Sequence, residues 1–260
     1  MNKKNNSTNP IEEPIATGVE SANKELTDFE SQAQLTQSKT VPFAVVEAYK
    51  TIRTNLMFTL SQKGTKCIVF SSSLPSEGKS TSSVNVAIAF SQLGHKTLVI
   101  DCDLRKPSLH KKLRVPNAKG LSSVLVGFSD ISETITNINP CLDVLTAGPT
   151  LPNPSELLGS ENLSNLLDAL KQYYEYIIID SPPINVVSDA LVIAPKTDGM
   201  VMIVQDYVTT HDQIKKALSS IELAGINLLG VILNGAENPK GSYKKKYYSK
   251  KNYYKGYGYY

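Results

Sequence analysis

The sequence lacks any long run of apolar residues. No stretch reaches the roughly 18 consecutive apolar residues that a membrane-spanning helix needs, and the opening MNKKNNSTNP has no apolar core of a signal peptide. We therefore expect that the protein does not enter a membrane by itself. Cysteine is scarce as well, because Cys67, Cys102 and Cys141 lie far apart and are odd in number. This excludes a disulfide framework and a paired-cysteine metal site, and is typical of a reducing cytoplasm.

Acidic residues are missing from residues 240–260. This stretch holds 7 of the 27 basic residues, which leaves 20 basic against 24 acidic residues, a net charge of −4, for the remainder of a chain whose total is +3. The basic character therefore belongs to a tail. The tail, GSYKKKYYSKKNYYKGYGYY, also lacks leucine, isoleucine and valine. It cannot pack a core, so we expect it to be disordered.

The remaining composition is that of an ordinary globular protein, with 41% hydrophobic and 20% charged residues in 260. Residues 1–40 are polar and follow no lasting period, which predicts a flexible segment. From Pro42 onward, apolar residues at helical spacing in VVEAYKTIRTNLMFTL predict an amphipathic helix. The chain then divides into a flexible segment (1–40), a folded domain that includes this helix (41–237) and a disordered tail rich in tyrosine and lysine (238–260).

Within the domain, short β-branched runs alternate with helical stretches. Strands are predicted at 67–71, 97–101, 142–146, 176–180, 199–205 and 228–233, and helices at 80–93, 121–126, 161–173 and 211–224. Several strands are apolar without alternation, as in a parallel sheet that is covered on both faces. The order predicts an α/β fold with a doubly wound, mostly parallel sheet of the P-loop NTPase type.

The first predicted strand runs into SLPSEGKST, which matches a phosphate-binding loop except that serine replaces its first glycine. Gly78 would let backbone amides curl around phosphate oxygens, and the following helix would point its positive end at them. Lys79 would reach the β- and γ-phosphates, Ser80 would bind Mg²⁺, and Thr81 would bond the α-phosphate. The alternative is a serine-rich turn that caps an ordinary helix.

Three aspartates follow two other strands. In LVIDCDLRKP, Asp101 and Asp103 lie at the carboxyl end of the second predicted strand. In YEYIIIDSPP, Asp180 ends the fourth predicted strand like a Walker B carboxylate. Because the carboxyl ends of parallel strands share one sheet edge, we expect these carboxylates near the loop, where a cation would relieve their repulsion. The loop and the aspartates together predict ATP and Mg²⁺ as ligands. The expected ligand residues are Ser76, Glu77, Gly78, Lys79, Ser80, Thr81 and Asn234 for ATP, and Ser80, Asp103 and Asp180 for the metal.

These three motifs and the terminal tyrosines resemble the bacterial tyrosine kinase family, specifically its cytoplasmic type that works in capsule or exopolysaccharide synthesis. The likeness covers residue 43 to the C-terminus. It implies that Asp101 and Asp103 join Lys79 as catalytic residues of a protein tyrosine autokinase. Asp101 is the expected base for the tyrosine hydroxyl, although the roles of Asp101 and Asp103 are interchangeable at this stage. Asn234 would touch the adenine, or simply form a turn; Arg105 would contact a phosphate or a neighbouring subunit, or be an ordinary surface arginine.

The family also carries a Glu-x-x-Arg-x-x-Arg segment that packs into the neighbouring subunit and closes a ring. Glu47, Lys50 and Arg53 stand at this spacing, with lysine in place of the first arginine. Lysine cannot form the bidentate pair that arginine forms. The residues alone fit equally a solvated helix face with an ion pair between residues three apart.

A different function remains open, that of the plasmid-partition and division-site ATPases, which share the fold and work as hydrolytic switches. Their signature lysine early in the loop is Leu74 here, which counts against this function. The nitrogenase iron protein, a further relative of the fold, is excluded because paired cluster cysteines are missing. In the hydrolytic switch the basic tail would bind membrane or nucleic acid.

In the kinase, the tail tyrosines are the phosphoacceptors, because eight hydroxyls on a flexible basic segment can reach a γ-phosphate. They are Tyr243, Tyr247, Tyr248, Tyr253, Tyr254, Tyr257, Tyr259 and Tyr260. The resemblance implies phosphorylation in trans within a homo-oligomer, a membrane-spanning adaptor that activates the kinase and holds it at the inner membrane face, a tyrosine phosphatase and further protein substrates. It implies no nucleic acid partner.

Overall fold

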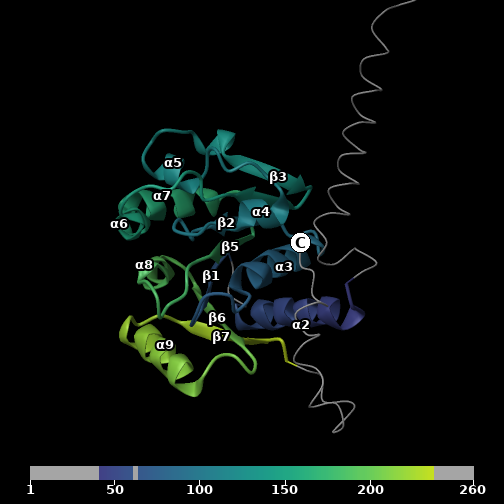
Figure 1. The fold of residues 1–260 in the computed structure, drawn as a ribbon. Coiled ribbons are helices and arrows are strands. Elements are labelled where there is room, and N and C mark those ends of the chain that lie inside the picture. The colour runs from purple at the N-terminus through teal and green to yellow at the C-terminus, as the bar shows by residue number, and fades with distance from the viewer. Residues whose placement is uncertain (1–40, 61–63, 237–260) are drawn as a thin grey trace, which may run out of the picture.

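The computed structural model describes residues 41–60 and 64–236. Their strands form one seven-stranded sheet in the order β3-β4-β2-β5-β1-β6-β7, in which only β3 runs antiparallel to its neighbour (Figure 1). The strands are β1 (Lys66–Ser72), β2 (Thr97–Asp101), β3 (Ile135–Asn139), β4 (Leu142–Leu145), β5 (Tyr176–Asp180), β6 (Gly199–Gln205) and β7 (Leu228–Asn234). This confirms the doubly wound α/β fold.

Helices cover both faces of the sheet (Figure 1). One face packs against α2 (Phe43–Thr59), α3 (Lys79–Ser91) and α4 (Leu109–Leu113). The other packs against α5 (Leu121–Leu125), α6 (Pro154–Gly159), α7 (Glu161–Leu170), α8 (Asp189–Ile193) and α9 (His211–Leu223). All seven residues of β1 are buried, because a central strand between two helical layers meets apolar side chains on both sides.

The register of the central strands brings the predicted site residues together at the carboxyl edge of the sheet. Asp101 at the end of β2 pairs with Asp180 at the end of β5, and β5 also pairs with β1, which leads into the glycine-containing loop. The backbone N–H of Cys102 donates to the carbonyl of Asp180 at 2.8 Å, which ties the two strand ends together. The two aspartates therefore lie side by side at the carboxyl edge.

The structure adds elements that the sequence patterns did not predict. These are β3, the short helices α4, α6 and α8, and two 3-10 turns, η1 (Ile131–Glu133) and η2 (Ala194–Lys196). β3 escaped prediction because ITNIN interrupts its apolar residues with asparagine and threonine at the sheet edge. The short helix α5 confirms the prediction at 121–126, whereas α4, α6 and α8, of five or six residues, are too short to show a helical period. The predicted helix at 161–173 ends at Leu170.

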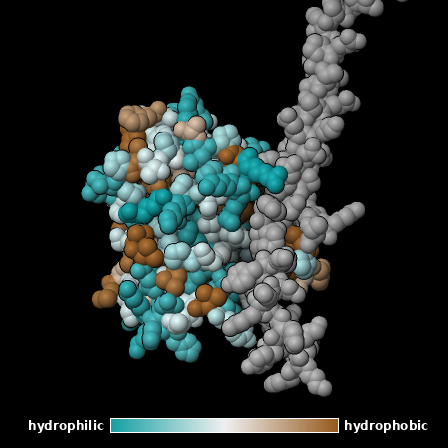
Figure 2. Space-filling view, in the orientation of Figure 1, coloured by the Kyte–Doolittle hydropathy of each residue, from teal (hydrophilic) through white to brown (hydrophobic). Residues whose placement is uncertain are grey.

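The visible face of the molecule is mostly hydrophilic, with apolar side chains in small separate groups (Figure 2). Among the residues that the structure describes, none of the helices combines the length and the apolar character needed to cross a bilayer. The predicted flexible segment (1–40) and the predicted tail (238–260) lie outside the described residues.

Candidate active site

The loop between β1 and α3 depends on Gly78 for its shape. Gly78 has a φ of 91°, and a Cβ at this position would lie 2.3 Å from Nδ2 of Asn234. Only glycine combines this backbone conformation with such a close neighbour. Ser76, two residues earlier, also has a positive φ of 68° and is exposed. The chain therefore turns sharply just before α3 begins at Lys79, as a phosphate-binding loop does.

Glu77 braces the loop from inside. Its side chain is buried, and its carboxylate accepts hydrogen bonds from the hydroxyl of Ser73, the backbone N–H of Leu74 at 2.8 Å and the hydroxyl of Thr209. These donors join the loop to the segment that follows β6. The contact with ATP that the sequence predicts for Glu77 stays a prediction, and because the carboxylate is occupied it would be made by the backbone. Thr209, which the sequence did not single out, belongs to the support of the site.

Asn234 lies against the other side of the loop. Its side-chain amide donates to the backbone carbonyl of Glu77 at 3.0 Å from the last residue of β7. Its side chain lies beside Gly78 of the loop. The adenine contact stays a prediction, and the bond to Glu77 gives Asn234 a structural role as well.

Lys79 is the centre of the site's charge cluster. Its ammonium lies 3.1 Å from Oδ2 of Asp103 and 3.5 Å from Oδ1 of Asp180, and donates to the hydroxyl of Ser80 at 3.1 Å. Burial by itself lowers the pKa of Lys79, but the charges of Asp180 and Asp103 outweigh it and raise the pKa. The lysine is therefore a permanent cation. Four of the predicted residues are thus brought into direct contact.

Asp101 and Asp103 differ in their surroundings. Asp101 is fully buried: Oδ1 accepts the backbone N–H of Asp103 at 3.1 Å, and Oδ2 accepts those of Ser108 and Leu109, each at 3.0 Å. Burial, followed by the charge of Asp180, raises the pKa of Asp101 to about 7. Asp103 is 5% exposed, and its Oδ1 accepts the backbone N–H of Lys106 at 3.0 Å. Asp101 shapes the turn after β2, while Asp103 faces Lys79.

The donor set fits a magnesium ion. Oδ2 of Asp180 is buried without a hydrogen-bond partner, and its other oxygen faces Lys79. Burial raises the pKa of Asp180 although Lys79 and the hydrogen bond from Ser80 oppose this. In the described part of the chain no three His, Cys, Asp or Glu side chains form a ready metal cage. Mg²⁺ needs no such cage, because it binds through one or two carboxylates with water and phosphate oxygens.

A second lysine approaches the loop from α4. Nζ of Lys112 donates to the hydroxyl of Thr81 at 2.9 Å. Burial lowers the pKa of Lys112, and Asp180 and Lys79 are both close enough to act on its charge. No sequence pattern points to Lys112, because its position depends on the short helix α4, which the sequence does not predict.

Arg105 pairs with residues of its own chain outside the loop. Its Nε donates to Oδ2 of buried Asp189 at 2.8 Å, and its Nη2 donates to Ser155 at 2.8 Å. These bonds connect the turn after β2 to α6 and α8, so Arg105 holds elements of one chain together.

The residues of the predicted oligomerisation helix lie on α2, which packs against α3. Lys50 pairs with Glu47 at 2.8 Å, and each side chain is 43% exposed. Nη1 of Arg53 donates to the backbone carbonyl of Ala89 at 2.9 Å. Arg53 thus anchors α2 to α3, the helix that begins at Lys79, and Glu47 and Lys50 form the surface ion pair expected of a solvated face. The contact with a neighbouring subunit stays a prediction.

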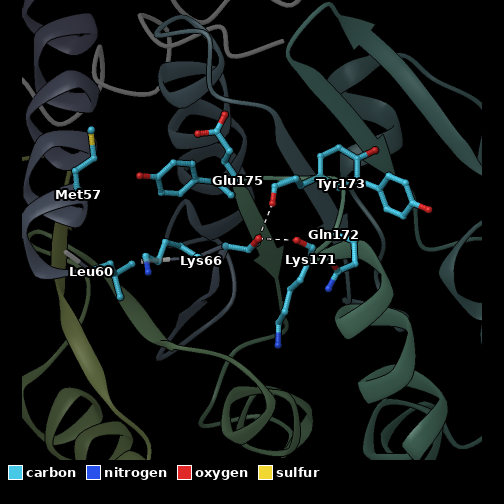
Figure 3. Close-up of a pocket in the computed structure, with 11 residues that line it drawn as sticks. Met57, Leu60, Lys66, Lys171, Gln172, Tyr173 and Glu175 are labelled. Carbon is cyan, nitrogen blue, oxygen red and sulfur yellow. Dashed lines mark hydrogen bonds between the residues drawn. The ribbon is translucent and has the colours of Figure 1, made fainter. Parts of the chain in front are cut away.

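A cavity of about 560 Å³ lies at the opposite edge of the sheet (Figure 3). Its lining includes Lys66 and Tyr176, which begin β1 and β5, and Met57 and Leu60. The hydroxyl of Thr65 closes one side by donating to the carbonyls of Lys171 and Tyr174 at 2.7 and 2.8 Å. Because the cavity lies at the amino ends of the strands, it is separate from the Lys79 cluster. The predicted phosphoacceptor tyrosines lie outside the described residues.

Comparisons with known proteins agree with this site. The sequence profile of the family described as AAA domain matches residues 65–225. The chain is similar to tyrosine-protein kinase YwqD of Bacillus subtilis, with 40% identity over 197 residues, 75% of this chain and 83% of the relative. It is 36% identical to tyrosine-protein kinase CpsD of Streptococcus agalactiae over 199 residues, 76% of this chain and 86% of the relative.

Solved structures also show similarity to bacterial tyrosine kinases. The crystal structure of the chimerical protein CapA2B2 matches with a TM-score of 0.74 and 39% identity, over 80% of this chain and 91% of the other. The kinase domain of the Escherichia coli tyrosine kinase Etk matches with a TM-score of 0.73 and 30% identity, over 80% and 86%. A ParA family ATPase from Chlorobium tepidum, at 20% identity and a TM-score of 0.57, shares the fold. The chain therefore belongs to the bacterial tyrosine kinase family, whose members are P-loop enzymes of the protein-tyrosine kinase class.

Proposed function

We propose that the protein transfers the γ-phosphate of ATP to the tyrosines of its own C-terminal tail, with one copy acting on the tail of another. The observation that carries this proposal is the position of Lys79. It lies at the end of the loop, 3.1 Å from Asp103 and 3.5 Å from Asp180, at the carboxyl edge of the sheet, where open α/β sheets bind ligands. A cation among carboxylates at this place suits the stabilisation of a transferring phosphoryl group.

Each residue of the cluster has a part in the proposed reaction. Lys79 and the loop amides would neutralise charge on the phosphate oxygens, and Ser80, Asp103 and Asp180 would hold Mg²⁺. Bound Mg²⁺ would supply further positive charge to the phosphate oxygens. The unpartnered Oδ2 of Asp180 supports this role, because a buried carboxylate oxygen without a donor calls for a cation.

Asp101 is the proposed base that takes the proton of the tyrosine hydroxyl. A pKa of about 7 suits a base that works near neutral pH. Its Oδ1 accepts a single N–H and keeps a lone pair, whereas Asp103 already pairs with Lys79. Because the base must be deprotonated, kcat should rise with pH, and Asp101→Asn should remove this rise. If Asp103 is the base instead, Asp103→Asn will remove the rise and Asp101→Asn will not.

The tail is the proposed substrate because of its composition. Its eight tyrosines and net charge of +7 allow approach to an acidic body and to ATP. Each phosphate adds roughly −1.5 to −2 charges, so about four phosphates would cancel the charge of the tail. Phosphorylation would then reverse its electrostatics and loosen a ring assembled around it.

The wider setting follows from the family resemblance and is proposed on that basis. We place the protein in the cytoplasm at the inner membrane face, held and activated by a membrane-spanning adaptor, where it regulates capsular or exopolysaccharide synthesis and export. The similarity to tyrosine-protein kinase CpsD supports the family membership from which this setting is inferred. A ring of identical subunits joined through α2, a tyrosine phosphatase and further protein substrates complete the proposed partners.

Incubation with γ-labelled ATP and Mg²⁺, followed by peptide mapping of residues 243–260, tests the proposed function. We expect label on tyrosine in this segment, lost in Lys79→Met and retained in the matched control Lys119→Met, whose lysine pairs with Glu133 on the surface. Label on serine, or rapid release of inorganic phosphate from an unlabelled protein, would overturn the proposal; the second result would indicate a hydrolytic switch.

A further inference from the structure

Lys112 lies at the edge of the Lys79 cluster without an acidic partner of its own. None of the ion pairs among residues 41–60 and 64–236 involves Lys112. Its side chain is partly buried, and its ammonium donates to the hydroxyl of Thr81 at 2.9 Å. A partly buried ammonium without a carboxylate is costly, so this arrangement calls for an anion nearby.

The hydrogen bond to Lys112 determines what the hydroxyl of Thr81 can do. A threonine hydroxyl has one proton to donate and two lone pairs. Lys112 occupies one of the lone pairs, so the hydroxyl proton of Thr81 is free to point elsewhere. The positive charge of Lys112 also makes the hydroxyl of Thr81 a stronger hydrogen-bond donor. Thr81 is in the first turn of α3, where the backbone N–H groups also point toward the loop. An oxygen of the α-phosphate is the acceptor that the loop would present there.

The charge balance of the cluster supports the same role. Asp103 and Asp180 both pair with a single lysine, Lys79, and the charge of Asp101 also acts on it. A nucleotide adds further negative charge. Lys112 is near enough for Asp180 and Lys79 to act on its charge, so it contributes a second positive charge to the same site.

We infer that Lys112 is a positioning residue of the nucleotide site, which acts through Thr81 to bind the α-phosphate of ADP and ATP. This inference rests on the proposed nucleotide site and adds a residue from outside the phosphate-binding loop. Because both nucleotides carry the α-phosphate, its contribution is the same for each.

Equilibrium binding of ADP and of a non-hydrolysable ATP analogue, with Mg²⁺, tests the inference without any turnover. Because Lys112→Ala removes a charge-assisted hydrogen bond, we expect it to lower the affinity for both nucleotides about tenfold. Lys112→Arg restores most of the affinity. Lys111→Ala is the matched control, because Lys111 is the exposed neighbouring lysine on the same helix. The unfolding midpoint without nucleotide checks that the variants are folded.

A double-mutant cycle with Thr81→Val tests whether Lys112 acts through Thr81. We expect the double variant to bind about as weakly as Thr81→Val alone. Additive losses, a loss confined to the triphosphate, or equal affinities of Lys112→Ala and Lys111→Ala would overturn the inference. Label transfer to the tail, measured on the same proteins, separates the two levels. If the wild-type protein labels its tail and Lys112→Ala binds nucleotide with wild-type affinity, only the role of Lys112 fails. If the wild-type protein binds nucleotide but leaves its tail unlabelled, the proposed function fails and the binding role of Lys112 is judged by the cycle alone.

Discussion

At the scale of single residues, the site is built from buried polar groups that are almost all paired. Glu77 accepts from three donors, and Asp101 accepts three backbone N–H groups. Buried carboxylates of this kind hold a loop in shape because each lost hydrogen bond leaves an unsatisfied group. The exception is Oδ2 of Asp180, which has no partner among the described residues. The unsatisfied atom lies where the metal is proposed to bind.

Glu77→Gln tests the bracing of the loop. The amide would turn one acceptor oxygen into a donor that faces other donors, so we expect the free energy of unfolding to fall by about 1–3 kcal/mol. Nucleotide affinity should fall as well, because the loop loses its support. Urea unfolding and ADP binding measure the two effects. Glu133→Gln, on the surface, is the control and should change neither; an unchanged Glu77→Gln would contradict the bracing role.

The raised pKa of Asp101 predicts how the stability of the folded protein depends on pH. Its pKa is raised from 3.8 to about 7, so between these values the folded protein holds a proton that the unfolded chain has released. The contribution of Asp101 to stability is therefore lost as the pH rises from about 4 to about 7, and levels off above this range. Thermal unfolding of the ligand-free protein across this range should show a smaller decline in Asp101→Asn. Parallel profiles would rule out this effect.

At the scale of elements, the apolar strands and the long helices were predictable, whereas the polar edge strand β3 and the short helices α4, α6 and α8 were not. β2, β5 and β6 have the predicted bounds, because buried central strands are apolar throughout. The loop and the three aspartates were found because their spacing carries their chemistry. Lys112 and Thr209 were not, since their roles depend on α4 and on the turn after β6, which bring distant residues to the loop.

The contact between α2 and α3 gives a prediction at this scale. Arg53 donates from α2 to a carbonyl of α3, so Arg53→Ala should lower the free energy of unfolding by about 1–3 kcal/mol. Lys50→Ala on the same helix should cost less than about 0.5 kcal/mol, because its ion pair is half-exposed. Urea unfolding of both variants compares them directly. Equal losses would mean that Arg53 does not anchor the helix.

At the scale of the whole molecule, the folded part supplies the donor site and the tail supplies the proposed acceptors. All residues of the Lys79 cluster come from β1, β2 and β5 or from the segments that follow them, so the sheet alone brings them together. The acceptors are separate from this scaffold in sequence. Such a division allows transfer between copies, because nothing in the cluster requires donor and acceptor to share one chain.

Mixing two variants tests this central claim most directly. The donor has an intact site and phenylalanine at the eight tail tyrosines, and the acceptor is Lys79→Met with its tyrosines intact. With γ-labelled ATP, neither variant alone should become labelled, and the mixture should carry label on tyrosines 243–260 of the acceptor. An unlabelled acceptor, under conditions in which the wild-type protein labels its own tail, would contradict transfer between copies.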